Sequence, residues 1–377
     1  MKKALIVSNS SGLISLFLNN DITILRDKGY IVDVACNTSF PDSNTRDFFS
    51  KYCNNIYHVD FPIRNLDISM ILKSFYQLTL IIKHGQYNVL HCHSTIAAVI
   101  ARQCAKKYRG KGLKVIYTSH GFPFYEGNFR GKARLFWIIE KYYSKYTDAI
   151  ITICNEDYIK AKKMKCKTVC LMHGVGIDVD RFVSIKINRD EYRKKLELKD
   201  SDKVILSVGE LNSNKNHQII IKALSLLNDS NYLYVICGRE VTEIGKRDEL
   251  EKLAQKLNVR IKFLGFRQDI PEICHSVEIG AIPSYKEGLG LSGIEMLASG
   301  IPIVGSNRQG IKDYVKINET GYLANPESEE SFAIAIKQAF RLKEKKCTKQ
   351  NCIDMAKNFS VEQSYDMILK VYNAIGV

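Results

Sequence analysis

PSYKEGLGLSGIEMLASGIPIVGSN, residues 283–307, is the stretch that decides the fold of this chain. An apolar run precedes it, a glycine-rich turn leads into the helical pattern LSGIEMLAS, and a second apolar run, IPIVGSN, closes it. A buried strand, a turn, a helix and a further buried strand are the repeating unit of a parallel sheet covered by helices. Gly288 and Gly290 allow a ligand to approach the backbone, and the helix start offers free N–H groups and the positive end of the helix dipole. The turn is therefore a predicted anion-binding site.

The two carboxylates of this stretch, Glu287 and Glu295, are open to two interpretations. Either both contact a ligand, or Glu295 completes a capping box with Ser292 in the pattern Ser-x-x-Glu and needs no ligand. The residues of the turn favour the two interpretations about equally.

The same alternation of strands and helices runs through both halves of the chain. In the first half the expected strands are residues 3–9, 31–36, 88–94, 114–121 and 148–154. In the second half they are residues 203–211, 232–238, 260–266, 277–284 and 301–307. The pattern breaks within residues 171–200, which predicts an α/β chain of two Rossmann-like, doubly wound parallel-sheet domains facing across a cleft. The expected domains are residues 1–180 and 181–360, with a C-terminal helix, 361–377, packed back on the first domain.

The composition is typical of a globular protein of the cytoplasm. Of 377 residues, 45% are hydrophobic and 25% are charged, and the length exceeds that of one typical core. Eleven cysteines are scattered without a repeating framework, and the first residues, MKKALIVSNS, have too short an apolar run for a signal peptide and are expected to form a strand. No apolar stretch reaches the roughly 18 residues of a membrane-spanning helix.

The net charge of +15 is concentrated in the first half of the chain. Residues 1–180 contain 25 Lys and Arg against 14 Asp and Glu, with basic runs at 102–114, 129–134 and 160–167. Solvated helix faces are the simplest explanation. Attraction to anionic lipid headgroups or to a phosphate-bearing acceptor is the second. Nucleic acid is not expected as a partner, because no reader motif or aromatic platform accompanies the charge.

Two more side chains are expected where strands end. In SVGELNSNKNH (207–217), Lys215 follows a strand and can serve as a point charge for a phosphate, although most such lysines are simply solvated. In YTSHGF (117–122), His120 can hydrogen-bond a ligand, and a structural role is an equal alternative.

No metal site is predicted. HCHS (91–94) is interpreted as structural, with His91 and His93 on opposite faces of a strand, which is poor metal geometry. DVD (178–180) resembles a metal-binding carboxylate pair, but it lies in the interdomain segment without an apolar strand to hold it.

Several of these motifs together resemble one family. The stretch 283–307 is similar to the signature of the retaining glycosyltransferases of family 4, whose fold is called GT-B and in which a Glu-x7-Glu pair brackets a glycine-rich turn. SVGELNSNKNH resembles the family's glycine–basic–x4–lysine motif, YTSHGF its Thr-x-His-Gly motif, and HGVGIDVDRF (173–182) its interdomain segment. The match covers nearly the whole chain in the right order. YTSHGFPFYEG (117–127) further resembles bacterial capsule, exopolysaccharide and O-antigen assembly enzymes.

The resemblance implies a nucleotide sugar, expected to be a UDP-sugar, held mainly by the second domain. A lipid-linked (polyprenyl-diphosphate) glycan acceptor would be held mainly by the first domain, in bacterial surface polysaccharide biosynthesis. His120 and Glu287 would be the catalytic residues. The donor-binding residues that the resemblance implies are Gly12, Lys215, Arg239, Phe266, Arg267, Gly288, Leu289, Gly290, Leu291, Ser292 and Glu295.

In this family the amides of the turn would hold the diphosphate, Lys215 would neutralise it, and Glu295 would bond the ribose. Fixed amides and a lysine stabilise a departing diphosphate without a metal, so neither metal nor cofactor is expected. Gly12 is expected in a loop under the donor. The basic first domain is expected to hold the enzyme peripherally at the inner face of the cytoplasmic membrane.

Two positions depart from the family pattern. The arginine that usually follows the glycine of the basic motif is Glu210 here, so one charge partner of the diphosphate is missing or is replaced by a residue such as Arg239. The Gly-Gly pair of the first domain is Ser11–Gly12.

Two other functions compete with transfer. A UDP-sugar 2-epimerase on the same fold would act on the donor alone and would need no acceptor. A basic nucleic-acid-binding protein would explain only the charge. A nicotinamide enzyme is not expected, because no G-x-G-x-x-G sequence follows a strand.

Overall fold

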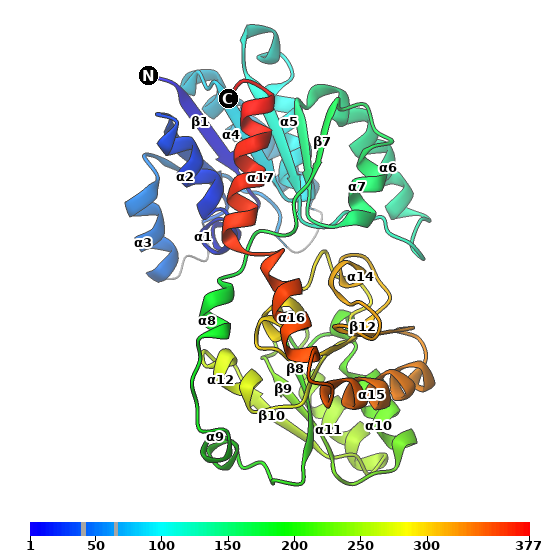
Figure 1. Ribbon diagram of the computed structural model, residues 1–377. Helices are drawn as coiled ribbons and strands as arrows, with labels where there is room; N and C mark the ends of the chain where they lie inside the picture. The colour runs from blue at the N-terminus through cyan, green and yellow to red at the C-terminus, as the bar shows by residue number, and fades with distance from the viewer. Residues whose placement is uncertain (39–42, 64–66) are drawn as a thin grey trace. The chain divides into compact units, whose positions relative to one another are not determined.

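The structure, a computed structural model, describes residues 1–38, 43–63 and 67–377. The chain folds into two compact units, which Figure 1 shows coloured along the sequence. The first unit comprises Met1–Gly176 and Val361–Val377, and the second comprises Ile177–Ser360. Each unit is a parallel sheet with helices, so the predicted α/β fold of two Rossmann-like domains is confirmed.

The sheet of the first unit has the order β3-β2-β1-β4-β5-β6-β7 over the described residues, and all its pairs are parallel. Its strands are β1 (Lys3–Val7), β2 (Ile31–Cys36), β3 (Ile56–His58), β4 (Val89–His93), β5 (Lys114–Ser119), β6 (Ala149–Thr152) and β7 (Thr168–Leu171). Every residue of β4 and of β6 is buried. Because successive side chains point to opposite faces, both faces of the sheet must be covered.

Helices provide that cover. They are α1 (Ser11–Phe17), α2 (Asn19–Asp27), α3 (Ser43–Tyr52), α4 (Ile68–Gly85), α5 (Thr95–Ala105), α6 (Lys132–Tyr143), α7 (Asn155–Ala161) and α17 (Val361–Ala374), with short 3-10 turns η1 (Arg109–Lys111) and η2 (Ser144–Tyr146). The first residues of the chain form β1, as predicted, and the eleven cysteines are thiols.

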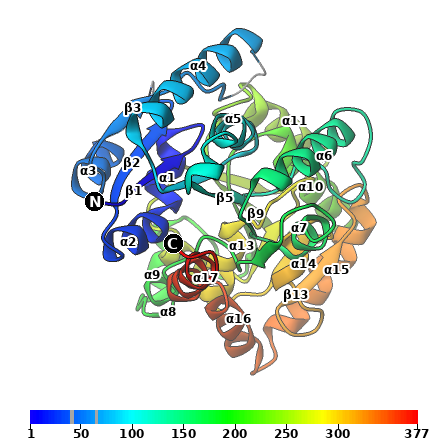
Figure 2. The ribbon, with the colours of Figure 1, turned by 90° about the horizontal axis from the view of Figure 1, so that it is seen from above.

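The C-terminal helix α17 belongs to the first unit although the second unit precedes it in the chain. It lies beside α2 in both Figure 1 and Figure 2. The side-chain amide of Asn20 donates to the carbonyl of Val361 over 2.9 Å, and Lys28 Nζ donates to the carbonyl of Val377 over 2.8 Å. Tyr372 is fully buried in this contact. The last helix is therefore part of the core of the first unit.

The basic run 102–114 contains a charge that is not on the surface. Arg102 of α5 is fully buried, and its Nη2 donates to Glu140 Oε2 of α6 over 2.8 Å. Its guanidinium also lies 4.3 Å from the ring centroid of Tyr117. Arg102 thus joins two helices, and the other basic residues of the run carry the surface charge.

The prediction that His91 and His93 lie on opposite faces of their strand is wrong. Side chains alternate along a strand with a period of two, so residues two apart share a face. Both rings are buried on one face of β4, with their centroids 4.3 Å apart.

The sheet of the second unit has the order β10-β9-β8-β11-β12-β13, again parallel throughout the described ranges. Its strands are β8 (Lys203–Val208), β9 (Tyr232–Cys237), β10 (Ile261–Gly265), β11 (Ile279–Ile282), β12 (Ile303–Ser306) and β13 (Gly321–Ala324). Its helices are α8 (Val179–Val183), α9 (Arg189–Lys195), the 3-10 turn η3 (Ser213–Lys215), α10 (His217–Leu227), α11 (Lys246–Lys256), α12 (Ile270–His275), α13 (Leu291–Ala298), α14 (Ile311–Tyr314), α15 (Glu329–Lys343) and α16 (Thr348–Lys357).

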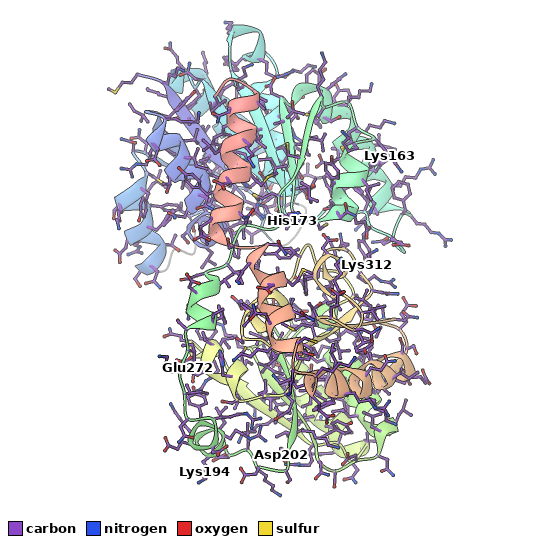
Figure 3. All side chains as sticks on the ribbon, viewed as in Figure 1. Lys163, His173, Lys194, Asp202, Glu272 and Lys312 are labelled. Carbon is purple, nitrogen blue, oxygen red and sulfur yellow. The ribbon has the colours of Figure 1, made fainter. Side chains whose placement is uncertain are left out.

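Figure 3 helps to locate the two ends of this sheet. Asp202, which precedes β8, marks the end where the strands begin, and Lys312 on α14 lies towards the end where they finish. Loops that follow neighbouring parallel strands meet at the finishing edge, where ligands of such sheets bind. The order places β8 directly beside β11, so the loop that carries Lys215 meets the glycine-rich turn.

Candidate active site

Asn214 joins the two loops that form the site. Its carbonyl accepts from the amide of Tyr285 over 2.9 Å, and its side-chain amide donates to the carbonyl of Lys286, also over 2.9 Å. The amide of Lys286 donates back to Asn214 Oδ1 over 3.1 Å. These three bonds place the residue after Asn214, Lys215, opposite the residue after Lys286, Glu287.

Lys215 and Glu287 form an ion pair. Lys215 Nζ lies 2.8 Å from Glu287 Oε2, and the two side chains are only 23% and 18% exposed. A charged pair that is mostly withdrawn from solvent is screened less than a pair on the surface. The sequence predicted both residues at this edge of the sheet, and the structure brings them into direct contact.

The glycine-rich turn leaves a row of amides free. Over the described residues, the N–H groups of residues 288–292 donate to no protein acceptor. The helix α13 that follows begins after Gly290, which has a φ of +80° and carries no side chain to cap the helix. Free amides at a helix start, with the positive end of the dipole, attract an anion. The turn therefore has the features of an anion site.

Close packing holds this turn in place. A Cβ at Gly290 would lie 2.8 Å from Glu287 Cγ, and one at Gly293 would overlap the ring of Tyr314. A Cβ at Gly310 would lie 2.7 Å from Leu289 Cα and would overlap the carbonyl oxygen of Gly288. Because the turn is packed between side chain and backbone without spare space, its amides are held in one arrangement.

The capping-box interpretation of Glu295 is wrong. The N-cap residue is Gly290, so Ser292 is the second residue of α13 and cannot cap it from that position. In the part of the chain that the structure describes, the Glu295 carboxylate makes no hydrogen bond. Burial raises its pKa, and the positive charge of Arg181 opposes that rise. A half-buried carboxylate without a hydrogen-bond partner is available to a ligand.

The positions next to β9 and β10 carry two arginines with different surroundings. The guanidinium of Arg239 lies 5.2 Å from the ring centroid of Phe266, which is 64% exposed. Arg267 pairs instead with Asp269, which also accepts from the hydroxyl of Tyr192. The hydrogen bond from Arg267 is the main reason that the pKa of Asp269 is lowered to about 2. The charge of Arg267 is thus neutralised by a carboxylate, whereas Arg239 contacts an aromatic ring.

Glu210, which stands where a cation was expected, has a structural contact. Its Oε1 accepts from the amide of Thr242 over 2.6 Å and from the Thr242 hydroxyl. The carboxylate therefore holds the loop after β9, in which Arg239 also lies.

The remaining candidates, His120 and Gly12, lie in the first unit. His120 follows β5, and its Nε2 lies 3.1 Å from Nδ1 of His93. Gly12 was expected in a loop, but it is the second residue of α1, whose N-cap, Ser10, accepts from the amide of Leu13. The reason is that Ser10 provides the side-chain oxygen that lets a helix start at this point.

Asp178 of the DVD pattern is explained by a helix cap as well. Its Oδ1 accepts from the amide of Arg181 over 3.0 Å at the start of α8. Elsewhere, Asp21, His91 and His93 in the first unit have potential ligand atoms within 4.8 Å of one another, a cluster that the sequence analysis did not anticipate. Two histidines two positions apart on a strand were the signal for it.

Comparison with known proteins identifies the family. Residues 23–181 match the family described as Glycosyltransferase Family 4, and residues 188–359 match Glycosyl transferases group 1. A Bacillus subtilis protein named "Putative glycosyltransferase EpsD" is 31% identical over 358 residues, which cover 93% of this chain and 90% of that protein. The chain is a family 4 glycosyltransferase.

Other relatives of this glycosyltransferase cover it almost completely. The UDP-Gal:α-D-GlcNAc-diphosphoundecaprenol α-1,3-galactosyltransferase of Escherichia coli is 26% identical over 369 residues, 93% of this chain and 91% of that one. The crystal structure of Anabaena HepE in complex with UDP-glucose has a TM-score of 0.79 at 18% identity and covers 99% and 100% of the two chains. The glycosyltransferase therefore has the GT-B fold. Within the described ranges it has no helix with the length and apolar character needed to cross a membrane.

Proposed function

We propose that this glycosyltransferase moves a sugar from a UDP-sugar to a lipid-linked glycan, with retention of the anomeric configuration, in bacterial surface polysaccharide synthesis. The row of free amides at residues 288–292, beside the Lys215–Glu287 pair, carries the proposal. The names of relatives support the substrates: the Escherichia coli enzyme is named for UDP-Gal and a diphosphoundecaprenol acceptor, and a 23% identical Campylobacter jejuni enzyme for a diphospho-undecaprenol acceptor.

Each candidate residue has a role in this reaction. The anomeric C–O bond to the diphosphate breaks and its electron pair stays on the diphosphate. The oxygen of the acceptor hydroxyl bonds to the same carbon, and its proton passes to an oxygen of the departing diphosphate. The amides of the turn and Lys215 stabilise the charge that develops on the diphosphate, which requires no metal. Glu287 contacts the donor sugar and Glu295 the ribose, and the role proposed for His120 is also a contact with the nucleotide sugar.

The base and the diphosphate have further candidate partners in the second unit. Phe266 has an exposed aromatic ring and the guanidinium of Arg239 lies beside it, which supports the proposal that both contact the nucleotide. Arg267 supports this region through its pair with Asp269. Gly12 keeps the first turn of α1 free of a side chain.

Full-length protein and a panel of nucleotide sugars test the proposal directly. Thermal shift identifies the nucleotide, and transfer of labelled sugar to a polyprenyl-diphosphate glycan identifies the reaction. We expect UDP and one UDP-sugar to raise the melting temperature. The proposal fails if no UDP-sugar is bound, transferred or hydrolysed. A change of the sugar without any acceptor would instead show an epimerase.

We also propose that the first unit binds an anionic membrane surface through α6. Leu135, Ile138 and Tyr142 lie on one face of this helix and are each about half exposed. Basic side chains accompany them: Lys132, Arg134, Lys141 and Lys145. Exposed apolar side chains among cations are typical of a helix that lies in a lipid interface.

Vesicle sedimentation tests the membrane proposal. We expect the protein to bind vesicles containing phosphatidylglycerol and not vesicles of phosphatidylcholine alone. Leu135→Glu together with Ile138→Glu should abolish binding. Leu226→Glu on α10 in the second unit, where the leucine is equally exposed, is the matched control and should bind like the wild type. Equal binding by all three proteins would refute the role of α6.

A further inference from the structure

Three histidines form a continuous row in the first unit. His91 and His93 are fully buried on β4, and His120 follows the neighbouring strand β5. The ring centroids of His91 and His93 lie 4.3 Å apart, those of His93 and His120 lie 5.4 Å apart, and His93 Nδ1 is 3.1 Å from His120 Nε2. The row therefore connects the interior of the unit to the candidate catalytic histidine.

The inner end of this row is fixed by hydrogen bonds. His91 Nδ1 lies 2.8 Å from the hydroxyl of Tyr372 on α17 and 3.2 Å from Asp21 Oδ1 on α2. Its Nε2 lies 2.8 Å from the hydroxyl of Thr118 on β5. Both nitrogens of His91 thus have partners, and the ring is held from three elements. Because His93 packs on this fixed ring, it has little freedom to rotate.

Hydrogen bonding explains the row better than a metal ion does. The potential ligand atoms of Asp21, His91 and His93 lie within 4.8 Å of one another, but both nitrogens of His91 already have hydrogen-bonding partners in the hydroxyls of Tyr372 and Thr118. The Nδ1 atom of His93 also has a hydrogen-bonding partner, because it lies 3.1 Å from His120 Nε2.

The unpartnered atom of His93 decides where its hydrogen lies. His93 Nε2 is buried and has no hydrogen-bond partner in the described part of the chain. A buried N–H without an acceptor is rarer than a buried acceptor without a donor. His93 therefore carries its hydrogen on Nδ1, where it can donate to His120 Nε2. Burial lowers the pKa of His93 well below its usual value and that of His120 to about 4, so both rings are neutral at pH 7.

We propose that His93 is a positioning residue that fixes the tautomer of His120. By donating to Nε2, it leaves the hydrogen of His120 on Nδ1, which has no partner among the described residues. His120 then acts as a neutral hydrogen-bond donor to an oxygen of the nucleotide sugar, a hydroxyl or a phosphate, and not as a base through Nε2. This inference rests on the proposed role of His120 as a ligand-contacting residue.

Nitrogen-15 NMR of the full-length protein measures the tautomer without relying on activity. With ¹⁵N-labelled histidine, and with His120→Asn to assign the signals, we expect His120 at neutral pH to be protonated on Nδ1 and unprotonated on Nε2. In His93→Leu the ring should become a mixture of both tautomers. A wild-type His120 protonated on Nε2 would overturn the proposal, as would a stoichiometric metal that His93→Leu removes.

Kinetics separate the positioning role from a structural one. His93→Leu should lower kcat by about ten- to a hundredfold with little change in KM for the donor. His93→Asn, whose side-chain N–H₂ lies near the place of Nδ1, should restore much of kcat. His84→Gln, at an exposed position of α4, is the control and should behave like the wild type.

The kinetic outcomes also distinguish this inference from the proposed function. If His120→Asn retains full transfer, His120 has no role and the proposed function of this residue fails. If His120→Asn loses transfer while His93→Leu keeps the wild-type kcat and tautomer, only the positioning role of His93 is refuted.

Discussion

Replacing Glu287 by glutamine should strengthen the binding of UDP while abolishing sugar transfer. In the free protein the charge of Lys215 is neutralised by Glu287, 2.8 Å away, and both side chains are mostly buried. Glutamine keeps the shape of the side chain but removes its negative charge. Lys215 would then present an uncompensated positive charge to the diphosphate, and the repulsion between the Glu287 carboxylate and the diphosphate would disappear.

The magnitude follows from Coulomb's law. Two unit charges about 6 Å apart interact by roughly 0.7 kcal/mol in water and roughly 3 kcal/mol at an effective dielectric constant of about 20. The partly exposed pair lies between these limits. A gain of about 1–2 kcal/mol corresponds to a Kd for UDP that is roughly five- to thirtyfold lower. Transfer should nevertheless be lost, because the proposed contact of Glu287 with the donor sugar needs the carboxylate.

Calorimetric titration of UDP at low and high salt measures this effect. The gain for Glu287→Gln should shrink at high salt because ions screen it. Glu251→Gln is the matched control, since it removes the same charge from another ion pair, with Arg247 on α11 of the same unit. Unchanged or weaker UDP binding in Glu287→Gln, or an equal gain in Glu251→Gln, would refute the placement of the diphosphate beside Lys215.

Three further perturbations have definite expected outcomes. Gly310→Ala should weaken UDP binding and lower the free energy of unfolding by about 1–3 kcal/mol. The φ of −68° suits alanine, but the new methyl group would collide with the backbone of Gly288. A wild-type melting temperature in thermal unfolding would contradict the tight packing of the turn. Arg102→Met should lower the free energy of unfolding, measured by urea titration, by about 3–5 kcal/mol, because it leaves Glu140 buried without its partner. A decrease of less than about 1 kcal/mol would mean that the pair is not buried as described. Burial lowers the pKa of His217 to about 4. Between about pH 6.5 and pH 4, this histidine is therefore protonated in the unfolded protein but neutral in the folded protein. The free energy of unfolding should therefore drop in this window by up to about 1.4 kcal/mol per pH unit from this group, and an equally steep drop in His217→Gln would show that the group does not contribute.

The sheets could be predicted from the sequence because their strands are buried on both faces. Continuous apolar runs such as IGAI (279–282) and YLYVIC (232–237) indicate a parallel sheet directly, and glycines and polar residues mark the turns between them. The same reasoning predicted that Lys215 and Glu287 lie at one edge of a sheet, because both residues follow strands. The fold and the edge that carries the candidate site are thus visible in local patterns.

The details of the site depend on contacts that no local pattern contains. The helix α13 begins at Leu291, directly after a turn that is packed against residues 310–314, and so the Ser292–Glu295 spacing is not a cap. His91 contacts Tyr372, which is 281 residues away in the sequence. The mistaken separation of His91 and His93 has a different origin, because the period of a strand was sufficient to place both on one face.

The position of α17 has a consequence for how the protein is made. Residues 361–377 complete the core of the first unit, but the ribosome must synthesise the whole second unit before they appear. At about 5–20 residues per second, α2 then remains without its covering helix for roughly 10–40 s after residue 176 has been synthesised. During that interval the nascent chain exposes the apolar surface that α17 later covers, and such a surface is a feature that chaperones recognise. Synthesis of residues 361–377 releases the first half of the chain from that risk.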